Sequence, residues 1–286
     1  MKKRSSGAIR RARFHTLLTD LERWPGSILQ RKQVRSFALF LVILAAFLVA
    51  WDLAVRFRLV LTLAPSPYQV WQQAVEIFSQ PFFRRGVNHV GIGWHLLASL
   101  RRVAIGFLLA AATAVPLGFL IGRSPTLARA VDPFVQVLKP VSPLVWLPIG
   151  LALLGKSEPT SVFVIFMSSL WPLLLNTVAG VRSVPAQYCD LARTLGAKRS
   201  TVLRRIVLPS ALPGIVTGLR ISLGIAWLVI VAAEMLVGGR GIGYFVWNEW
   251  NNLNVASIVV AILATGATGL VLDRLVQRLE GMVSYE

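Results

Sequence analysis

Six long apolar runs constrain what this chain can fold into more than any other feature. Each run is close to the ~20 residues that a helix needs to cross the ~30 Å hydrocarbon layer of a bilayer. Only 15% of the residues are charged and 55% are hydrophobic, whereas soluble domains carry roughly 25% charged residues. We therefore expect an all-α integral membrane protein with spans near residues 36–55, 100–121, 133–154, 160–181, 212–237 and 255–276.

The positive charges indicate how the chain is oriented. Lysine and arginine number 30 against 12 acids, and ten of these cations lie in residues 1–35 and six in residues 180–210. A basic excess is also typical of nucleic-acid-binding proteins, but cations that flank apolar spans follow the positive-inside rule. We expect contact with membrane lipid and no nucleic acid, with both termini and the loops near 123–132, 180–210 and 273–286 in the cytoplasm.

The first apolar run is predicted to remain in the mature protein. The N-terminal tail is longer and more basic than a secretory signal, and no small-residue cleavage site follows residues 36–55. The next segment, residues 56–98, is rich in aromatic side chains, including Trp71, Phe82 and Trp94. Because aromatic residues gather at headgroup level, this composition predicts an interfacial segment on the outer face.

Three prolines interrupt the third run. Pro140, Pro143 and Pro148 lie within nine residues of one another, and a proline inside a helix removes a hydrogen bond and crowds the preceding turn. Lipid tolerates such a break only where protein or a water-filled cavity satisfies the freed backbone groups. The third span is therefore predicted to be broken and to line a path.

Motifs for catalysis and metal binding are not supported by their context. Gly150–Ser157 matches the phosphate-loop pattern G-x-x-x-x-G-K-S, but such a loop follows a strand and opens a helix, whereas this match ends an apolar span. His15, His89 and His95 show no metal-ligand spacing, and the single cysteine, Cys189, excludes a disulfide within the chain. We expect no catalytic residue, metal site or cofactor in this chain.

A charged insert between the fourth and fifth runs has a helical pattern of its own. An apolar stripe recurs at helical spacing up to Leu195, and Gly196 then allows the left-handed turn that ends a helix. A second short amphipathic segment follows, and Pro209 and Pro213 are expected to mark where the chain turns back towards the membrane. The pattern predicts a helix, a glycine joint and a second helix.

This insert resembles the coupling loop of binding-protein-dependent ABC transporter permeases. The pattern of that loop is E-A-A, a glycine four residues after the last alanine, and I-x-L-P. Here Asp190 stands in place of the Glu and Leu191 in place of the first Ala. The positions that match the pattern are Ala192, Gly196, Ile206, Leu208 and Pro209. The resemblance spans about Ser99 to Arg278 and implies coupling to an ATPase through Asp190, Leu191, Ala192, Arg193, Leu195, Gly196, Ala197, Ile206, Leu208 and Pro209.

The resemblance also implies an architecture and a set of partners. The fold would be that of a type I ABC importer permease, with about six transmembrane helices and a cytoplasmic coupling helix. The partners would be a second permease copy, two cytoplasmic ABC ATPases that hold ATP and Mg, and an extracytoplasmic solute-binding protein, in a bacterial inner membrane. The domains would be a tail (1–35), the first span (36–55), an outer segment (56–98), a permease core (99–278) with its coupling loop (182–210), and a C-terminal tail (279–286).

Within the family, Leu154–Thr160 and Phe166–Pro172 look most like the nitrate and bicarbonate permeases of cyanobacteria. This resemblance favours nitrate or nitrite as substrate, then bicarbonate, and then cyanate, taurine or alkanesulfonates. A membrane scaffold or receptor without transport is the alternative from a different class.

Candidate residues of the translocation path are polar or aromatic side chains in the third to fifth spans: Lys139, Trp146, Ser168, Ser169, Trp171, Asn176, Arg220, Trp227 and Glu234. A cation within a membrane usually faces a cavity or a partner, so we hypothesise that Arg220 offsets the charge of the substrate. Snorkelling of Arg220 and helix-joining hydrogen bonds of the serines are the alternatives. Glu234 fits a hydrogen-bonded gate or packing residue, because an acid would repel an anion.

Overall fold

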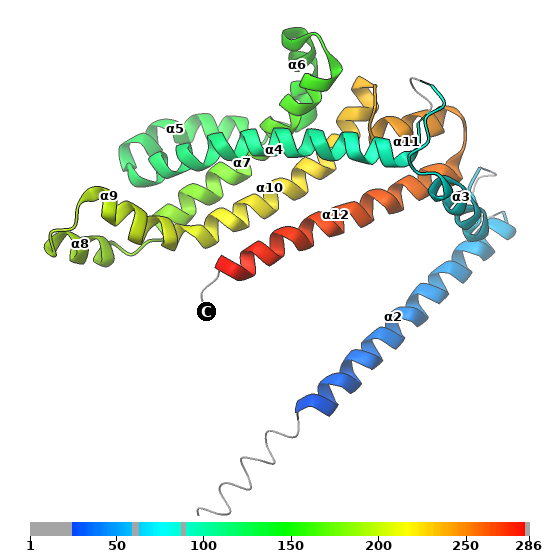
Figure 1. Ribbon diagram of the computed structural model, residues 1–286, viewed down its shortest axis with the longest axis horizontal. Helices are drawn as coiled ribbons and strands as arrows, with labels where there is room; N and C mark the ends of the chain where they lie inside the picture. Colours follow the sequence, from blue (N-terminus) through cyan, green and yellow to red (C-terminus); the bar gives the residue numbers. More distant parts are fainter. Residues whose placement is uncertain (1–24, 59–62, 87–89, 284–286) are drawn as a thin grey trace, which may run out of the picture. The chain divides into compact units, whose positions relative to one another are not determined.

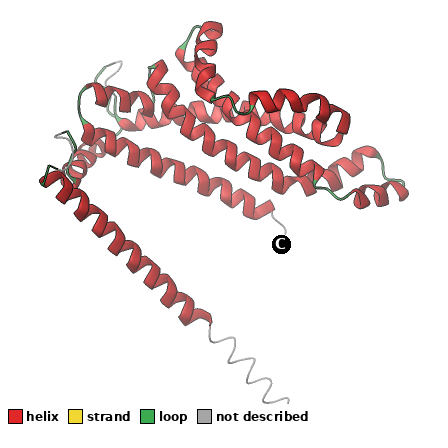
Figure 2. Ribbon diagram, turned by 180° about the vertical axis from the view of Figure 1, so that it is seen from behind, coloured by secondary structure: helices red, strands yellow, loops and turns green. Residues whose placement is uncertain are grey.

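A computed structural model describes residues 25–58, 63–86 and 90–283 of the chain. These residues form helices joined by short connections, with one isolated β-bridge and no strand among them, as predicted (Figure 2). The chain divides into two compact units, the first ending at Tyr68 and the second beginning at Gln69. Most of the predicted N-terminal tail, as well as His15 and His89, lies outside the described residues.

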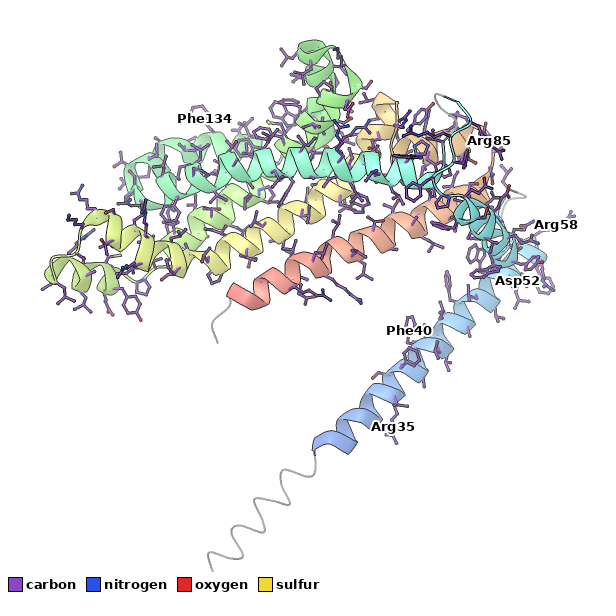
Figure 3. All side chains as sticks on the ribbon, viewed as in Figure 1. Arg35, Phe40, Asp52, Arg58, Arg85 and Phe134 are labelled. Atoms are coloured by element: carbon purple, nitrogen blue, oxygen red, sulfur yellow. The ribbon has the colours of Figure 1, made fainter. Side chains whose placement is uncertain are left out.

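The first unit contains α2 (Pro25–Arg56), whose residues Val34–Arg56 are long and apolar enough to span a membrane. None of that stretch is buried within the structure, and side chains such as Phe40 project outwards from the helix (Figure 3). The helix begins before the predicted span, so residues 25–35 of the predicted tail are helical. Proline is favoured at a first helical position, where its missing N–H would have had no partner.

The second unit opens with α3 (Pro67–Ser79) and a segment that folds back on the start of α4 (Ile92–Arg123). The backbone N–H of Gly93 donates to the carbonyl of Pro81 at 2.8 Å, and the indole of Trp94 donates to the carbonyl of Phe82 at 2.9 Å. The Arg84 guanidinium lies 4.0 Å from the centre of the Trp94 ring. Residues 92–98 of the predicted outer segment thus belong to α4, and the position of this segment at the outer face stays a prediction.

Helix α4 packs against α7 (Ser157–Arg182) along a face of small residues. This face repeats every fourth residue and consists of Gly106, Ala110, Ala114, Gly118 and Gly122. A Cβ on Gly106 would come within 2.8 Å of Ile165, and a Cβ on Gly118 within 2.7 Å of Thr177. Small residues let membrane helices approach closely, so this stripe positions α7 against α4.

Helix α10 (Leu208–Val237) packs on the other side of α7. A Cβ on Gly214 of α10 would lie 2.8 Å from the Cα of Gly180 in α7, so the two backbones touch at this level. A Cβ on Gly218, one turn further along, would lie 2.8 Å from the Cβ of Asn176. Helices α4, α7 and α10 thus form the packed centre of the second unit (Figure 1).

The third predicted span is broken, as the prolines indicated. It consists of α5 (Pro125–Leu138), a 3₁₀ turn (Pro143–Val145) and α6 (Trp146–Leu154), and the two halves are bent by 84°. Figure 1 shows α5 lying along α4 while α6 points away from it. The predicted loop at residues 123–132 is largely helical instead, because Ser124 caps α5 by accepting a hydrogen bond from the N–H of Leu127 at 3.2 Å.

The prolines after the charged insert do not turn the chain. A short helix, α9 (Arg199–Val202), continues through a π-helical turn (Leu203–Val207) into α10, so that Arg199–Val237 is one helical stretch of 39 residues. The expectation that Pro209 and Pro213 mark a turn was wrong. We attribute this to the π-helical turn, which widens the helix just before Pro209, where a proline ring would otherwise crowd the preceding carbonyl.

The remaining helices are α11 (Ile242–Asn251) and α12 (Val255–Val283). Among the described residues, five helices are long and apolar enough to cross a membrane, and the bent α5–α6 pair raises this to six. The predicted spans at 100–121, 160–181, 212–237 and 255–276 lie inside α4, α7, α10 and α12, which confirms them. A cluster of charged and polar side chains connects α10 to α4, and a second one connects it to α12.

Candidate functional site

The predicted coupling loop has the expected helix, glycine, helix geometry. Helix α8 (Ala186–Thr194) is followed by its cap, Leu195, and then by Gly196, whose φ is +74°. The N–H of Gly196 donates to the carbonyl of Arg193, and the N–H of Ala197 to that of Ala192, both at 2.9 Å. This pair of bonds ends a helix with a left-handed residue, a conformation that glycine adopts at little cost.

The apolar stripe of α8 is divided between the protein interior and its surface. Ala192 is buried and packs in a cluster with Val181 at the end of α7 and Val207 before α10. Leu191 is 60% exposed and Leu195 is 78% exposed. Leu191 on α8 and Leu195 directly after it therefore present large apolar side chains at the surface. Coupling to an ATPase through them stays a prediction.

The remaining residues of the predicted coupling set surround this face. Asp190 and Arg193 form an exposed ion pair of 3.1 Å, which contributes little to stability. Ile206 and Ala197 are half-buried, whereas Leu208 and Pro209 are exposed. Cys189 is half-buried and lines a cavity of about 300 Å³ with Arg123 and Arg199.

Two of the four predicted path residues on α7 donate hydrogen bonds within their own helix. The Ser168 hydroxyl donates to the carbonyl of Ile165, and the Asn176 amide donates to that of Pro172, both at 2.8 Å. The Ser169 hydroxyl and the Trp171 indole N–H are buried with no hydrogen-bond partner among the described residues. A role for these donors in holding an anion stays a prediction.

The predicted path residues do not gather at one site. Lys139 is exposed just after α5, and Trp146 begins α6. Arg220 and Trp227 line a cavity of about 310 Å³ between α10 and α12, and the Trp227 indole donates to the carbonyl of Thr265 at 3.1 Å. This arrangement joins α10 to α12.

Arg220 already has two acidic partners. Its guanidinium forms two bonds to the carboxylate of Asp273, at 2.8 and 3.1 Å, and one to Glu280 at 3.1 Å. Both acids lie on α12. The hypothesis that Arg220 offsets the charge of a substrate stays a prediction, and this geometry favours a role in joining two helices.

Glu234 lies at the centre of a buried polar cluster near the far end of α10. Its carboxylate accepts hydrogen bonds from the Ser99 hydroxyl at 2.8 and 2.9 Å and from Arg102 Nη1 at 2.7 Å, both on α4. It also accepts from the backbone N–H of Gly243 at 3.1 Å. Glu234 is fully buried and Arg102 is 6% exposed, so this ion pair is shielded from solvent.

The same cluster holds the loop between α10 and α11. Arg102 donates to the carbonyl of Arg240, His95 Nδ1 accepts from the N–H of Gly241 at 3.1 Å, and the Ser99 hydroxyl accepts from the N–H of Ile242 at 2.9 Å. With the Glu234–Gly243 bond, four consecutive residues are held through their backbones. We call His95, Ser99, Arg102 and Glu234 the Glu234 cluster.

Sequence reasoning included Glu234 as a candidate but missed the other three members. His95, Ser99 and Arg102 recur at spacings of four and three, which places them on one face of a helix. A charged residue inside an apolar span usually marks a functional or structural partner. That signal is present for Arg102, but only the packing of α4 against α10 identifies Glu234 as its partner.

Comparison with solved structures shows the fold, and a family match shows the class of protein. The fold resembles the permease of the MetNI methionine ABC transporter in its inward-facing conformations, with a TM-score of 0.58, 17% identity, and coverage of 66% of this chain and 94% of that one. The fold is therefore that of a type I ABC importer permease. Residues 114–285 match the family described as the binding-protein-dependent transport system inner membrane component, and the chain belongs to this family.

Close relatives bear two different names. The chain is 45% identical over 219 residues to the nitrate import permease protein NrtB of Synechocystis sp., covering 77% of this chain and 80% of the relative. It is 38% identical over 265 residues to the bicarbonate transport system permease protein CmpB of Synechococcus elongatus, covering 92% of each. The chain is thus a multi-pass, non-catalytic membrane subunit that works with ATPase and binding-protein partners.

Proposed function

We propose that this chain forms the translocation path of an ATP-driven importer for a small inorganic anion, with nitrate or nitrite as the first candidate. The observation that carries the proposal is the predicted coupling loop, which lies between the end of α7 and the start of α10 and exposes Leu191 and Leu195. A helix with an apolar face can sit in a groove of another protein. In this proposal the groove belongs to an ATPase subunit.

The loop and α10 provide a direct mechanical connection. Ala192 and Val202 pack against Val207 and Ala211, so α8, α9 and the start of α10 share one apolar cluster. Movement of the ATPase subunits on ATP binding would displace this cluster and tilt the helix that extends from it to Val237. The proposal places the loop and both termini in the cytoplasm, with a second copy of the chain completing the path.

The choice between nitrate and bicarbonate rests on the relatives alone. The nitrate permease of Synechocystis has the higher identity, whereas the bicarbonate permease of Synechococcus elongatus matches over more of the chain. Bicarbonate is therefore the second candidate, ahead of cyanate, taurine and alkanesulfonates.

Uptake by the reconstituted transporter tests the proposal. The chain with its ATPase and binding-protein partners is placed in proteoliposomes with internal ATP, and uptake of ¹⁵N-nitrate and ¹³C-bicarbonate is compared. ATP-dependent nitrate uptake that excess bicarbonate does not reduce supports the first candidate, and the converse supports the second. Absence of ATP-dependent uptake of any of the named anions would contradict the proposed function.

A further inference from the structure

A cavity of about 450 Å³ lies at the end of the second unit opposite the coupling loop. In Figure 1, α11 and the start of α12 lie at this end, and α8 and α9 lie at the other. The walls come from α3, the segment before α4, α11 and the first turn of α12. Their polar side chains include Gln73, Glu76, Tyr244, Asn248, Glu249 and Asn254.

The charge of this cavity is opposite to that of the chain. The chain has a net charge of +18 and only 12 acids, yet Glu76 and Glu249 both line the cavity. Within the described part of the chain, neither carboxylate has an ion-pair or hydrogen-bond partner. Arg85 (Figure 3) also lines the cavity, and its guanidinium lies 5.6 Å from the centre of the Phe83 ring. We call this cavity the acidic recess.

One wall of the acidic recess is firmly attached to the transmembrane helices. Helix α11, which carries Asn248 and Glu249, begins at the loop that the Glu234 cluster holds through four backbone groups. His95 belongs to that cluster and also reaches the recess. Glu234 lies near the end of α10, and α10 extends to the predicted coupling loop. A force on α11 would therefore be transmitted through Glu234 to α10.

The chemistry of the recess selects among possible occupants. The carboxylates of Glu76 and Glu249 outnumber the single guanidinium of Arg85 in the lining, so the recess is unsuited to the proposed anionic substrate. No group of three or more His, Cys, Asp or Glu side chains that could hold a metal ion occurs among the described residues. Carboxylates flanked by amide groups instead suit a lysine or arginine side chain, which offers several N–H donors and a positive charge.

We propose that the acidic recess receives a basic side chain of the extracytoplasmic solute-binding protein. The inference rests on the proposed function, because it requires the recess to face away from the cytoplasm and a binding protein to dock there. Docking at α11 would then act directly on α10 through the Glu234 cluster.

The test measures how tightly the binding protein holds the assembled transporter. The probe is the solute-binding protein that stimulates ATP hydrolysis by the wild-type transporter in lipid nanodiscs. We expect Glu76→Gln and Glu249→Gln each to weaken its binding roughly three- to tenfold, and Glu76→Lys with Glu249→Lys to weaken it more than about thirtyfold. The wild-type affinity should fall with added salt more steeply than that of the double variant, because charge pairs are screened.

Glu158→Gln is the matched control. Glu158 is an exposed acid at the start of α7, 3.7 Å from Arg101, and it does not line the recess. This variant should bind like the wild type. Size-exclusion chromatography of each variant with the ATPase subunits identifies any that fail to assemble, and the conservative glutamine variants retain the side-chain volume.

The possible results separate this inference from the proposed function. Stimulation of the wild-type transporter by the binding protein supports the proposed function by itself. Loss of affinity confined to the recess variants supports docking, and affinities within twofold of wild type overturn it while the proposed function stands. The amount of zwitterionic lipid that copurifies with each variant is measured as well. If the recess variants change that amount and leave the binding-protein affinity unchanged, the occupant is a lipid headgroup and the inference is overturned.

Discussion

Arg102 of α4 and Glu234 of α10 form a buried ion pair, with Nη1 and Oε1 2.7 Å apart and side chains 7% and 0% exposed. Charges removed from water in this way are stable only when paired and hydrogen-bonded. Ser99 and the backbone of Gly243 complete the bonding of the Glu234 carboxylate. The pair therefore connects two transmembrane helices and the loop that leads into α11.

Removing one partner of this pair should destabilise the protein strongly. Glu234→Gln leaves the Arg102 charge buried without a counter-ion, a change that typically costs about 3–5 kcal/mol. We expect a clear fall in the thermal unfolding midpoint of the purified protein. Arg102→Met with Glu234→Gln leaves no buried charge and should cost less than the two single changes together. Strict additivity in this double-mutant cycle would contradict an interaction between the two residues.

Gly241 should tolerate no side chain. Its φ is +155°, and an added Cβ would collide with the carboxylate of Glu234. We expect Gly241→Ala to displace the loop and to release α11, which hydrogen exchange at residues 240–251 would detect as lost protection. Gly239→Ala is the control, because its φ is +91° but no atom lies within 4 Å of its added Cβ. Equal effects of the two substitutions would show that backbone strain alone is responsible.

The left-handed conformation of Gly196 should be required for coupling. Gly196→Val places a β-branched residue at φ +74°, where such residues are genuine outliers. We expect a loss of ATPase stimulation by the binding protein, with the transmembrane helices intact. Gly196→Asn should retain most of this stimulation, because asparagine adopts the left-handed region more readily. Full activity of Gly196→Val would count against the coupling role.

The exposed leucines of α8 should contribute to binding of the ATPase rather than to folding. Leu195→Glu changes a side chain that is 78% exposed, so thermal stability should change by less than about 0.5 kcal/mol. Retention of the ATPase subunits during affinity purification should fall at least tenfold. Gln187→Glu introduces the same charge at another exposed position of α8 and should retain them. Equal retention by both variants would place the ATPase contact elsewhere.

Arg220→Gln distinguishes helix joining from an effect on the substrate. The substitution leaves Asp273 and Glu280 without their cationic partner, so we expect a lower unfolding midpoint together with slower transport. Asp273→Asn in the same chain should restore part of both, because it removes the unpaired charge. Slower transport with an unchanged midpoint, and no rescue by Asp273→Asn, would instead support the charge-offset hypothesis.

Local signals were sufficient to predict most of the fold. Long apolar runs identify the spans because only helices satisfy their backbone groups within lipid. Pro140 and Pro143 predict the break between α5 and α6, and Gly196 predicts the end of α8, because each residue restricts or permits particular backbone angles. The family pattern predicted the helix, glycine, helix geometry of the insert despite two changes in its leading residues, and its coupling role stays a prediction.

Features that depend on tertiary packing could not be predicted. Glu234 lies 132 residues from Arg102 and 135 from Ser99, so no local pattern links them. Arg220 was predicted from its position alone, without its partners on α12. The error at Pro209 arose because a π-helical turn, which leaves no mark in hydrophobic periodicity, accommodates the proline within a continuous helix.

The 84° bend at residues 139–142 has a consequence for motion. Helices α4, α7 and α10 are pressed together by glycine and alanine contacts, so they are expected to move as one rigid body. The bend instead lies in a short non-helical linker between the end of α5 and the 3₁₀ turn that begins at Pro143. Pro140 within this linker and Pro143 directly after it each have a restricted φ, which leaves few backbone torsions free. A change in the angle between α5 and α6 would therefore move α6 along a restricted path, and the transport cycle would pass through a small number of defined conformations.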